Sequence, residues 1–122
     1  MPDRLLDGTI LLRDGQIAEI AAGRSQVPGA LDLEGDHLIP GIIDLHTDNL
    51  ERQVLPRAGA RWPSRSAMLS HDAQTAAAGV TTVFDALCVG DINPNGARHR
   101  TFLDGVADLA ALAPAGVLKC DH

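Results

Sequence analysis

The residues best suited to chemistry stand at the end of a short, nearly apolar run, Ile42–Leu45. This run leads directly into His46, and Asp48 follows two positions later. Residues i and i+2 of a strand share a face, so the imidazole and the carboxylate can point into one site. Such ligands bind divalent transition metals, among them Zn²⁺, Mn²⁺ and Fe²⁺. A histidine and an aspartate that only end a strand in solvent are the alternative.

The elements before this pair read as a small antiparallel sheet. Over residues 8–20, two apolar runs flank Asp14-Gly15. This dipeptide tolerates the positive φ values of a tight turn, so the pattern predicts a β-hairpin. Leu31–Leu33 alternates as a short third strand, and Glu34–Asp36 then turns the chain. Two or three strands alone are marginally stable, so this sheet needs a partner.

The elements from Pro40 onward alternate between strand and helix. The expected order is strand 42–46, loop 49–65, helix 67–78 capped by Ser66 and stopped by Gly79, strand 80–85, loop 91–96, and a helix from 98 to about Pro114. This order is that of a βαβα unit, which implies a parallel sheet with right-handed crossovers. A (β/α)₈ barrel takes roughly 250 residues, so 122 residues hold a part of one or half of an assembly.

Composition and charge restrict the kinds of partner and the cellular compartment that we expect. The net charge is −6, the isoelectric point is near 5.1, and only 2% of the residues are aromatic. Nucleic-acid binders need basic surfaces and stacking platforms, so we expect no nucleic-acid partner. No apolar run approaches the roughly twenty residues of a membrane span, and no secretory signal is visible. Cys88 and Cys120 lie far apart in the sequence. We therefore expect two reduced thiols and a cytoplasmic protein.

The segment from Gly35 to His46 resembles the entry to the metal-dependent amidohydrolase superfamily. In that superfamily a small N-terminal sandwich precedes a barrel whose first strand ends in His-x-His, whereas here the third position is Asp48. A longer string is similar to the PhnM family of phosphonate metabolism, whose motif is His-Thr-Asp. The segments that carry this resemblance are His46–Glu51, Pro56-Arg57, Arg61–Pro63, Ser70–Gln74, Ala78–Leu87 and Gly90-Asp91.

The resemblance implies an α/β chain with an incomplete amidohydrolase fold. Residues 1–39 would be part of a β-sandwich, and residues 40–122 the first two βα units of a TIM barrel. The implied activity is release of diphosphate from α-D-ribose 1-methylphosphonate 5-triphosphate. His46 and Asp48 would be metal ligands, with zinc expected first and manganese or iron as alternatives. The remaining ligands and the acid–base groups are expected beyond residue 122, so this chain would be inactive alone.

The arginine-rich loop gains a role from the same resemblance. A triphosphate offers many oxygens to guanidinium forks, so we assign substrate binding to Arg57 and Arg61, with Trp62 stacking on the substrate or walling its site. Solvated charges and a packed loop aromatic are the alternatives. His71 and Asp72 have a structural or surface role. Asp85 either faces the site or caps the next loop.

Two other functions remain open from the sequence. A cyclic amide hydrolase of the same superfamily would use the same metal site on a C–N bond. A chain complete at 122 residues would instead be a non-catalytic interaction module, because a partial barrel exposes a sheet edge and apolar helix faces. Such surfaces also make a homo-oligomer an expectation. A small phosphorylated substrate is the partner that the resemblance implies.

Overall fold

A computed structural model describes residues 5–90 and 98–122. The chain divides into two compact units, Met1–Leu38 and Ile39–His122. Its described residues form a mixed α/β structure with two small sheets, which agrees with the predicted class at this level. The loop expected over residues 91–96 lies outside the described residues.

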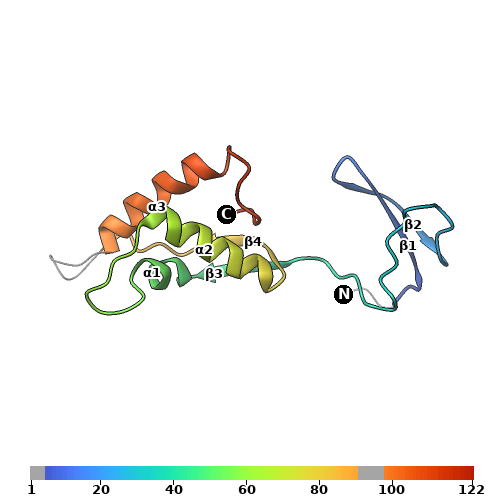
Figure 1. Cartoon of the computed structure of the whole chain (residues 1–122), viewed down its shortest axis with the longest axis horizontal. Helices are drawn as coiled ribbons and strands as arrows, with labels where there is room; N and C mark the ends of the chain where they lie inside the picture. Colours follow the sequence, from blue (N-terminus) through green and yellow to red (C-terminus); the bar gives the residue numbers. More distant parts are fainter. Residues whose placement is uncertain (1–4, 91–97) are drawn as a thin grey trace. The chain divides into compact units, whose positions relative to one another are not determined.

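The first unit contains the predicted hairpin. Strands β1 (Gly8–Arg13) and β2 (Gln16–Ala22) pair antiparallel, and Arg13 pairs with Gln16 across a two-residue turn (Figure 1). Asp14 and Gly15 form the turn with φ values of 52° and 72°. Positive φ at both positions matches the right-handed twist of the strands, so the local dipeptide sets the register.

The expected third strand at Leu31–Leu33 is wrong. These residues form no strand, although the turn after them is present, because Asp36 N–H donates to the Leu33 carbonyl at 2.8 Å. The Asp32 carboxylate accepts from Glu34 N–H at 2.8 Å, and such a local bond competes with a sheet ladder. No strand other than β1 and β2 occurs in the described part of this unit.

The second unit is built on a parallel pair of strands. Strand β3 (Ile42–Thr47) and strand β4 (Val80–Asp85) lie side by side, as predicted for a βαβ crossover. Asp121 continues the sheet on the other side of β4. Val83 N–H donates to the Asp121 carbonyl at 2.7 Å, and Asp121 N–H donates to the Thr81 carbonyl at 2.9 Å. The sheet therefore has three parallel positions.

Three helices in the described residues accompany this sheet: α1 (Asn49–Val54), α2 (Ser64–Ala77) and α3 (Arg98–Leu112). The prediction of a loop over residues 49–65 is wrong in its first part, because α1 buries Leu50 and Val54, one helical turn apart. Helix α2 begins after Pro63, so Ser66 is not its cap. Gly79, at φ 83°, follows the helix as expected.

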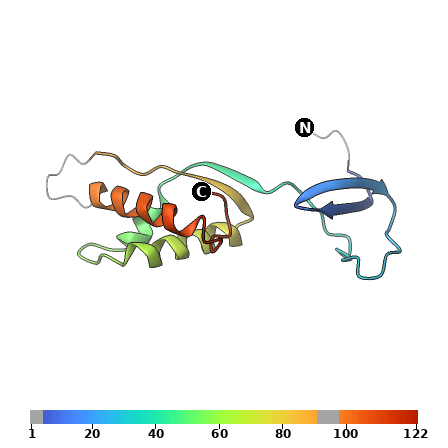
Figure 2. The ribbon, with the colours of Figure 1, turned by 90° about the horizontal axis from the view of Figure 1, so that it is seen from above.

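The helices cover one face of the sheet. Figure 2 shows β3 and β4 on one side of the second unit and α2 beside α3 on the other. The core is formed by five buried residues from the helices: Leu50, Val54, Ala67, Met68 and Leu112. On the strands, Leu45 is 75% exposed and Phe84 is 57% exposed, whereas Val83 is buried. One side of the sheet is therefore packed and the other is bare.

A close approach explains the Pro-Gly that precedes β3. A Cβ added to Gly41 would overlap the side chain of Thr81, at the start of β4. The next residue, Ile42, donates its N–H to the Gly79 carbonyl at 3.0 Å. Glycine at position 41 thus allows the two strands to meet in register.

Candidate functional site

The ends of the parallel strands bring the first predicted residues to one edge of the sheet. Thr47 pairs with Asp85, and Ala86 N–H donates to the Thr47 carbonyl at 2.8 Å. His46 and Asp48 stand on either side of Thr47, so they lie at the carboxyl ends of the strands. This edge is where parallel α/β folds place their ligands.

His46 and Asp48 are both exposed. Among the described residues, neither side chain has a hydrogen-bond or ion-pair partner, and neither lies in a group of three ligand-type residues. The backbone N–H of His46 donates to Asp44 Oδ1 at 3.2 Å, which fixes the chain just before the pair. An unengaged imidazole and carboxylate suit metal binding, and their role as ligands remains a prediction.

The three residues assigned to substrate binding differ in their surroundings. Arg57 is exposed in the turn after α1, and the Trp62 side chain is 55% exposed. The Arg61 guanidinium instead contacts α3. It donates to Thr101 Oγ1 at 3.1 Å and to Asp104 Oδ2 at 2.9 Å. Arg57 is free to meet a phosphate, whereas Arg61 already holds its segment against the helix; both assignments remain predictions.

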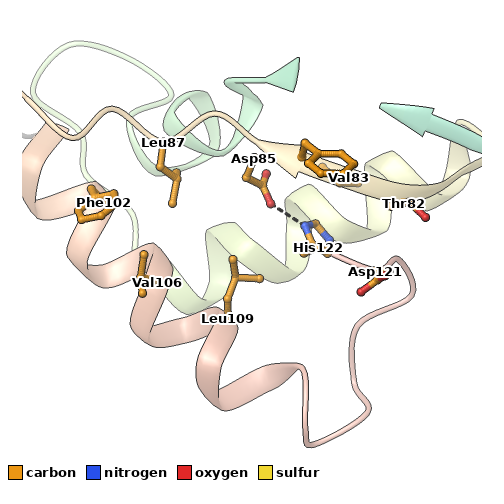
Figure 3. A pocket seen from close by; sticks show the side chains of 10 residues that line it. Thr82, Val83, Asp85, Leu87, Phe102, Val106, Leu109, Asp121 and His122 are labelled. Carbon is orange, nitrogen blue, oxygen red and sulfur yellow. Dashed lines mark hydrogen bonds and ion pairs between the residues drawn. The ribbon is translucent and has the colours of Figure 1, made fainter. Parts of the chain in front are cut away.

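A buried polar cluster lies behind the strand ends. It consists of four side chains with at most 4% exposure: His71, Asp72, Asp85 and His122. His71 Nε2 lies 2.7 Å from Asp85 Oδ1, and His122 Nδ1 lies 2.7 Å from Asp85 Oδ2 (Figure 3). Asp85 thus turns toward α2 and bridges two imidazoles, and His71 has no surface role.

Asp72 holds the segment Lys119–His122 from the other side. Its carboxylate accepts from Lys119 N–H at 2.8 Å and from Cys120 N–H at 2.9 Å, and His122 Nε2 lies 3.4 Å away. A helix side chain therefore satisfies two backbone amides of the segment that leads to Asp121. Sequence reasoning missed this role and that of His122.

The helical spacing of the cluster was a usable sequence signal. Met68, His71 and Thr75 share one face of α2, and Met68 and His71 are both buried. The Thr75 hydroxyl donates to the His71 carbonyl at 2.7 Å. A polar residue placed on the apolar face of a helix needs a buried partner, here Asp85.

The hydrogen bonds of the cluster set its charges. Burial alone would raise the pKa of Asp85, but hydrogen bonds from His122 and His71 outweigh it and lower the pKa to about 2. Burial likewise opposes ionisation of Asp72, yet the N–H groups of Cys120 and Lys119 lower its pKa. The hydrogen bond to Asp85 raises the pKa of His122, against the effect of burial.

Two overlapping groups in the described part of the chain have the donor types of a metal site. His71, Asp85 and His122 form one, and Asp72, Cys120 and His122 the other, each with ligand atoms within 4.8 Å of one another. However, separate imidazoles occupy the two Asp85 oxygens, and the Cys120 thiol donates to the Val80 carbonyl at 3.2 Å. These contacts are those of a hydrogen-bond network.

A pocket of about 520 Å³ opens between β4 and α3, beside this network. Its wall on α3 is apolar and is formed by Phe102, Val106 and Leu109, and Figure 3 shows Val106 and Leu109 pointing from α3 toward the side on which Leu87 and Asp85 lie. The pocket therefore offers an apolar surface with one polar edge.

A comparison with curated proteins found a relative that matches the whole chain. The chain is 37% identical over all 122 of its residues to alpha-D-ribose 1-methylphosphonate 5-triphosphate diphosphatase from Escherichia coli (strain K12). The chain is therefore similar to this diphosphatase. The chain spans 32% of the length of the diphosphatase, and the match includes both units.

The other comparisons add no likeness. No protein-family model matches the chain. No solved structure matches it. Within residues 5–90 and 98–122, none of the helices is long and apolar enough to cross a bilayer.

Proposed function

We propose that this chain belongs to a metal-dependent hydrolase that releases diphosphate from α-D-ribose 1-methylphosphonate 5-triphosphate. The main support for this proposal is the 37% identity of the whole chain to a diphosphatase named for this substrate. Two free ligand-type side chains at the carboxyl edge of a parallel sheet support the proposal. In this interpretation, residues 1–39 are part of a sandwich, and residues 40–122 begin a (β/α)₈ barrel.

His46 and Asp48 would hold a divalent ion, zinc first, or manganese or iron. Their donor chemistry fits, because a neutral imidazole nitrogen and a carboxylate oxygen both suit these metals. A bound divalent ion lowers the pKa of water and polarises phosphoryl oxygens. The two residues supply part of a ligand set, and the other ligands would come from outside the described residues.

The reaction adds water across the bond between the phosphorus nearest ribose and the oxygen that leaves with diphosphate. Arg57, exposed and without a side-chain partner in the described part of the chain, would bind phosphate oxygens of the substrate. Trp62 would form a wall beside it. The free thiols Cys88 and Cys120 support a cytoplasmic location.

A hybrid enzyme tests this proposal. This chain would replace the matching third of the Escherichia coli diphosphatase, and diphosphate release would be measured with the triphosphate ester, alongside hydrolysis of a cyclic amide. We expect hydrolysis of the ester alone. H46A and D48A should each abolish it, since each removes a metal ligand, while metal content falls and circular dichroism stays unchanged.

The exposed Asp36 gives the matched control, because D36N alters a carboxylate ten residues or more along the sequence from the motif. Full turnover by H46A or D48A at ordinary metal concentration would refute the ligand assignment. Cleavage of the cyclic amide instead of the ester would refute the phosphate specificity.

A further inference from the structure

The buried polar cluster joins three parts of the second unit and has no place in the proposed reaction. His71 and Asp72 come from α2, Asp85 ends β4, and His122 belongs to the segment that extends the sheet. The His122 side chain is 0% exposed, and its ring meets both carboxylates. The cluster therefore holds that segment from two directions.

The contacts of His122 favour a doubly protonated ring. The two backbone N–H groups that Asp72 accepts make its carboxylate an acceptor, and Asp85 presents its two oxygens to two different imidazoles. A neutral imidazole has one N–H, but His122 faces an acceptor at both ring nitrogens. Both contacts are hydrogen bonds only when both nitrogens carry hydrogen, that is, when the ring is an imidazolium.

Other titratable groups face His122 from α2, β4 and its own segment. From α2, His122 meets Asp72 and the ring of His71, whose centroid lies 5.5 Å away. From β4 it meets Asp85, and α3 contributes only apolar groups to the pocket beside it. In its own segment the Asp121 carboxylate lines the same pocket as His122, and the Cys120 thiol is kept neutral, because burial and then the charge of Asp72 raise its pKa.

We propose that the proton of the His122 imidazolium fastens the segment Lys119–His122 to α2 and β4, and that loss of this proton weakens this attachment. Without the proton, one ring nitrogen would turn a lone pair toward a buried carboxylate oxygen. This repulsion cannot be relieved by water, because both side chains are buried.

The direction of the pH dependence follows from linkage. The pKa of His122 is raised above its ordinary value of 6.5, so the stabilisation is complete below pH 6.5 and is lost as the pH rises through the raised pKa. The pKa of Asp85 is lowered, so its contribution is present above pH 3.8 and is lost as the pH falls through about 2. The segment is held most firmly between these limits.

The test combines two measurements on the full chain. ¹⁵N NMR of the imidazoles reports the protonation of His122 directly, with the exposed His37 ring in the same spectrum. Amide hydrogen exchange reports docking through Asp121 N–H and Val83 N–H, which bond across the sheet. We expect His122 to carry two N–H groups at pH 6.5 and to lose one at higher pH.

The loss of amide protection must match the shift of the His122 midpoint measured by NMR. Protection of the Asp121 and Val83 amides should fall about tenfold for each pH unit by which the His122 midpoint exceeds 6.5. Protection of Ile42 N–H, bonded to Gly79, should stay unchanged. Full protection after His122 has titrated, or a His122 ring that carries a single N–H at pH 6.5, would overturn the proposal.

Matched variants separate His122 from its neighbour. H122N keeps one donor toward Asp85 but has no charge, so protection of Asp121 should be low and independent of pH. H71Q keeps its Nε2-like donor and should retain the pH dependence. D85N should lower the His122 midpoint, and this readout remains if H122N fails to fold.

The metal alternative is tested with Co²⁺ added to chelator-treated chain. We expect no visible absorption band that depends on His122. A Co²⁺ absorption band that disappears in H122N would show a metal rather than a proton between these side chains, and would overturn the proposal.

Discussion

Replacing Arg61 with alanine removes two contacts that hold the segment after α1 against α3. One is the hydrogen bond to Thr101 Oγ1 at 3.1 Å, and the other is the ion pair with Asp104 at 2.9 Å. Hydrogen bonds to charged groups contribute about 1.5–3 kcal/mol. The Arg61 and Asp104 side chains are 26% and 35% exposed, so solvent screens the pair and moves its value toward that of surface ion pairs.

We therefore expect R61A to lower the free energy of unfolding by about 1–2 kcal/mol. For a domain of this size, a loss of 1 kcal/mol lowers Tm by about 4 °C. Trp62 is the single tryptophan and adjoins Arg61, so its fluorescence during urea unfolding measures the change. R57A is the matched control. Its side chain is exposed, and we expect a change within about 0.5 kcal/mol.

The hybrid enzyme then separates stability from substrate binding. R57A should raise KM for the triphosphate by about tenfold to a hundredfold, because a charge-assisted contact is lost. R61A with unchanged stability would refute the stabilising role of the Arg61 contacts with α3. Equal destabilisation by R57A and R61A would refute it as well, because only Arg61 has those contacts.

Three further predictions concern the described fold. G41A should lower stability by about 1–3 kcal/mol, measured by urea unfolding, because its Cβ would overlap Thr81, whereas G90A, with open space at that position, should not. As the pH falls from 3.8 through about 2, protonation of Asp85 should remove about 2 kcal/mol, and D85N should lack this loss in acid titrations followed by circular dichroism. Cys88 should react with an aromatic disulfide in the native chain, whereas Cys120, buried and with a raised pKa, should react only after unfolding; rapid modification of both would contradict this.

Elements with local causes could be predicted from the sequence. Asp14-Gly15 determines a turn within two residues, and the β-branched run after Gly79 gives β4 with its observed bounds. Helix α1 was missed because it has six residues and one turn of apolar spacing. The expected strand at Leu31–Leu33 failed because three alternating residues fit an aspartate-stabilised turn equally well.

The candidate site also has a part that the sequence predicts and a part that it does not. His46 and Asp48 could be placed at a strand end from adjacent residues, whereas the buried polar cluster joins positions 14 to 50 residues apart. No spacing rule connects Asp72 with Cys120 or His122. What the sequence does contain is a polar pair on the buried face of α2, which requires partners without naming them.

The bond between Asp72 and Cys120 closes a loop of 48 residues, whereas the hairpin closes over two. Local turns of this kind form in about 1–10 μs, and contacts between distant residues form more slowly because their loop entropy must be overcome first. The hairpin is therefore expected to form early and independently. The third position of the parallel sheet is expected to fill last, once α2 has packed and presents the carboxylate of Asp72.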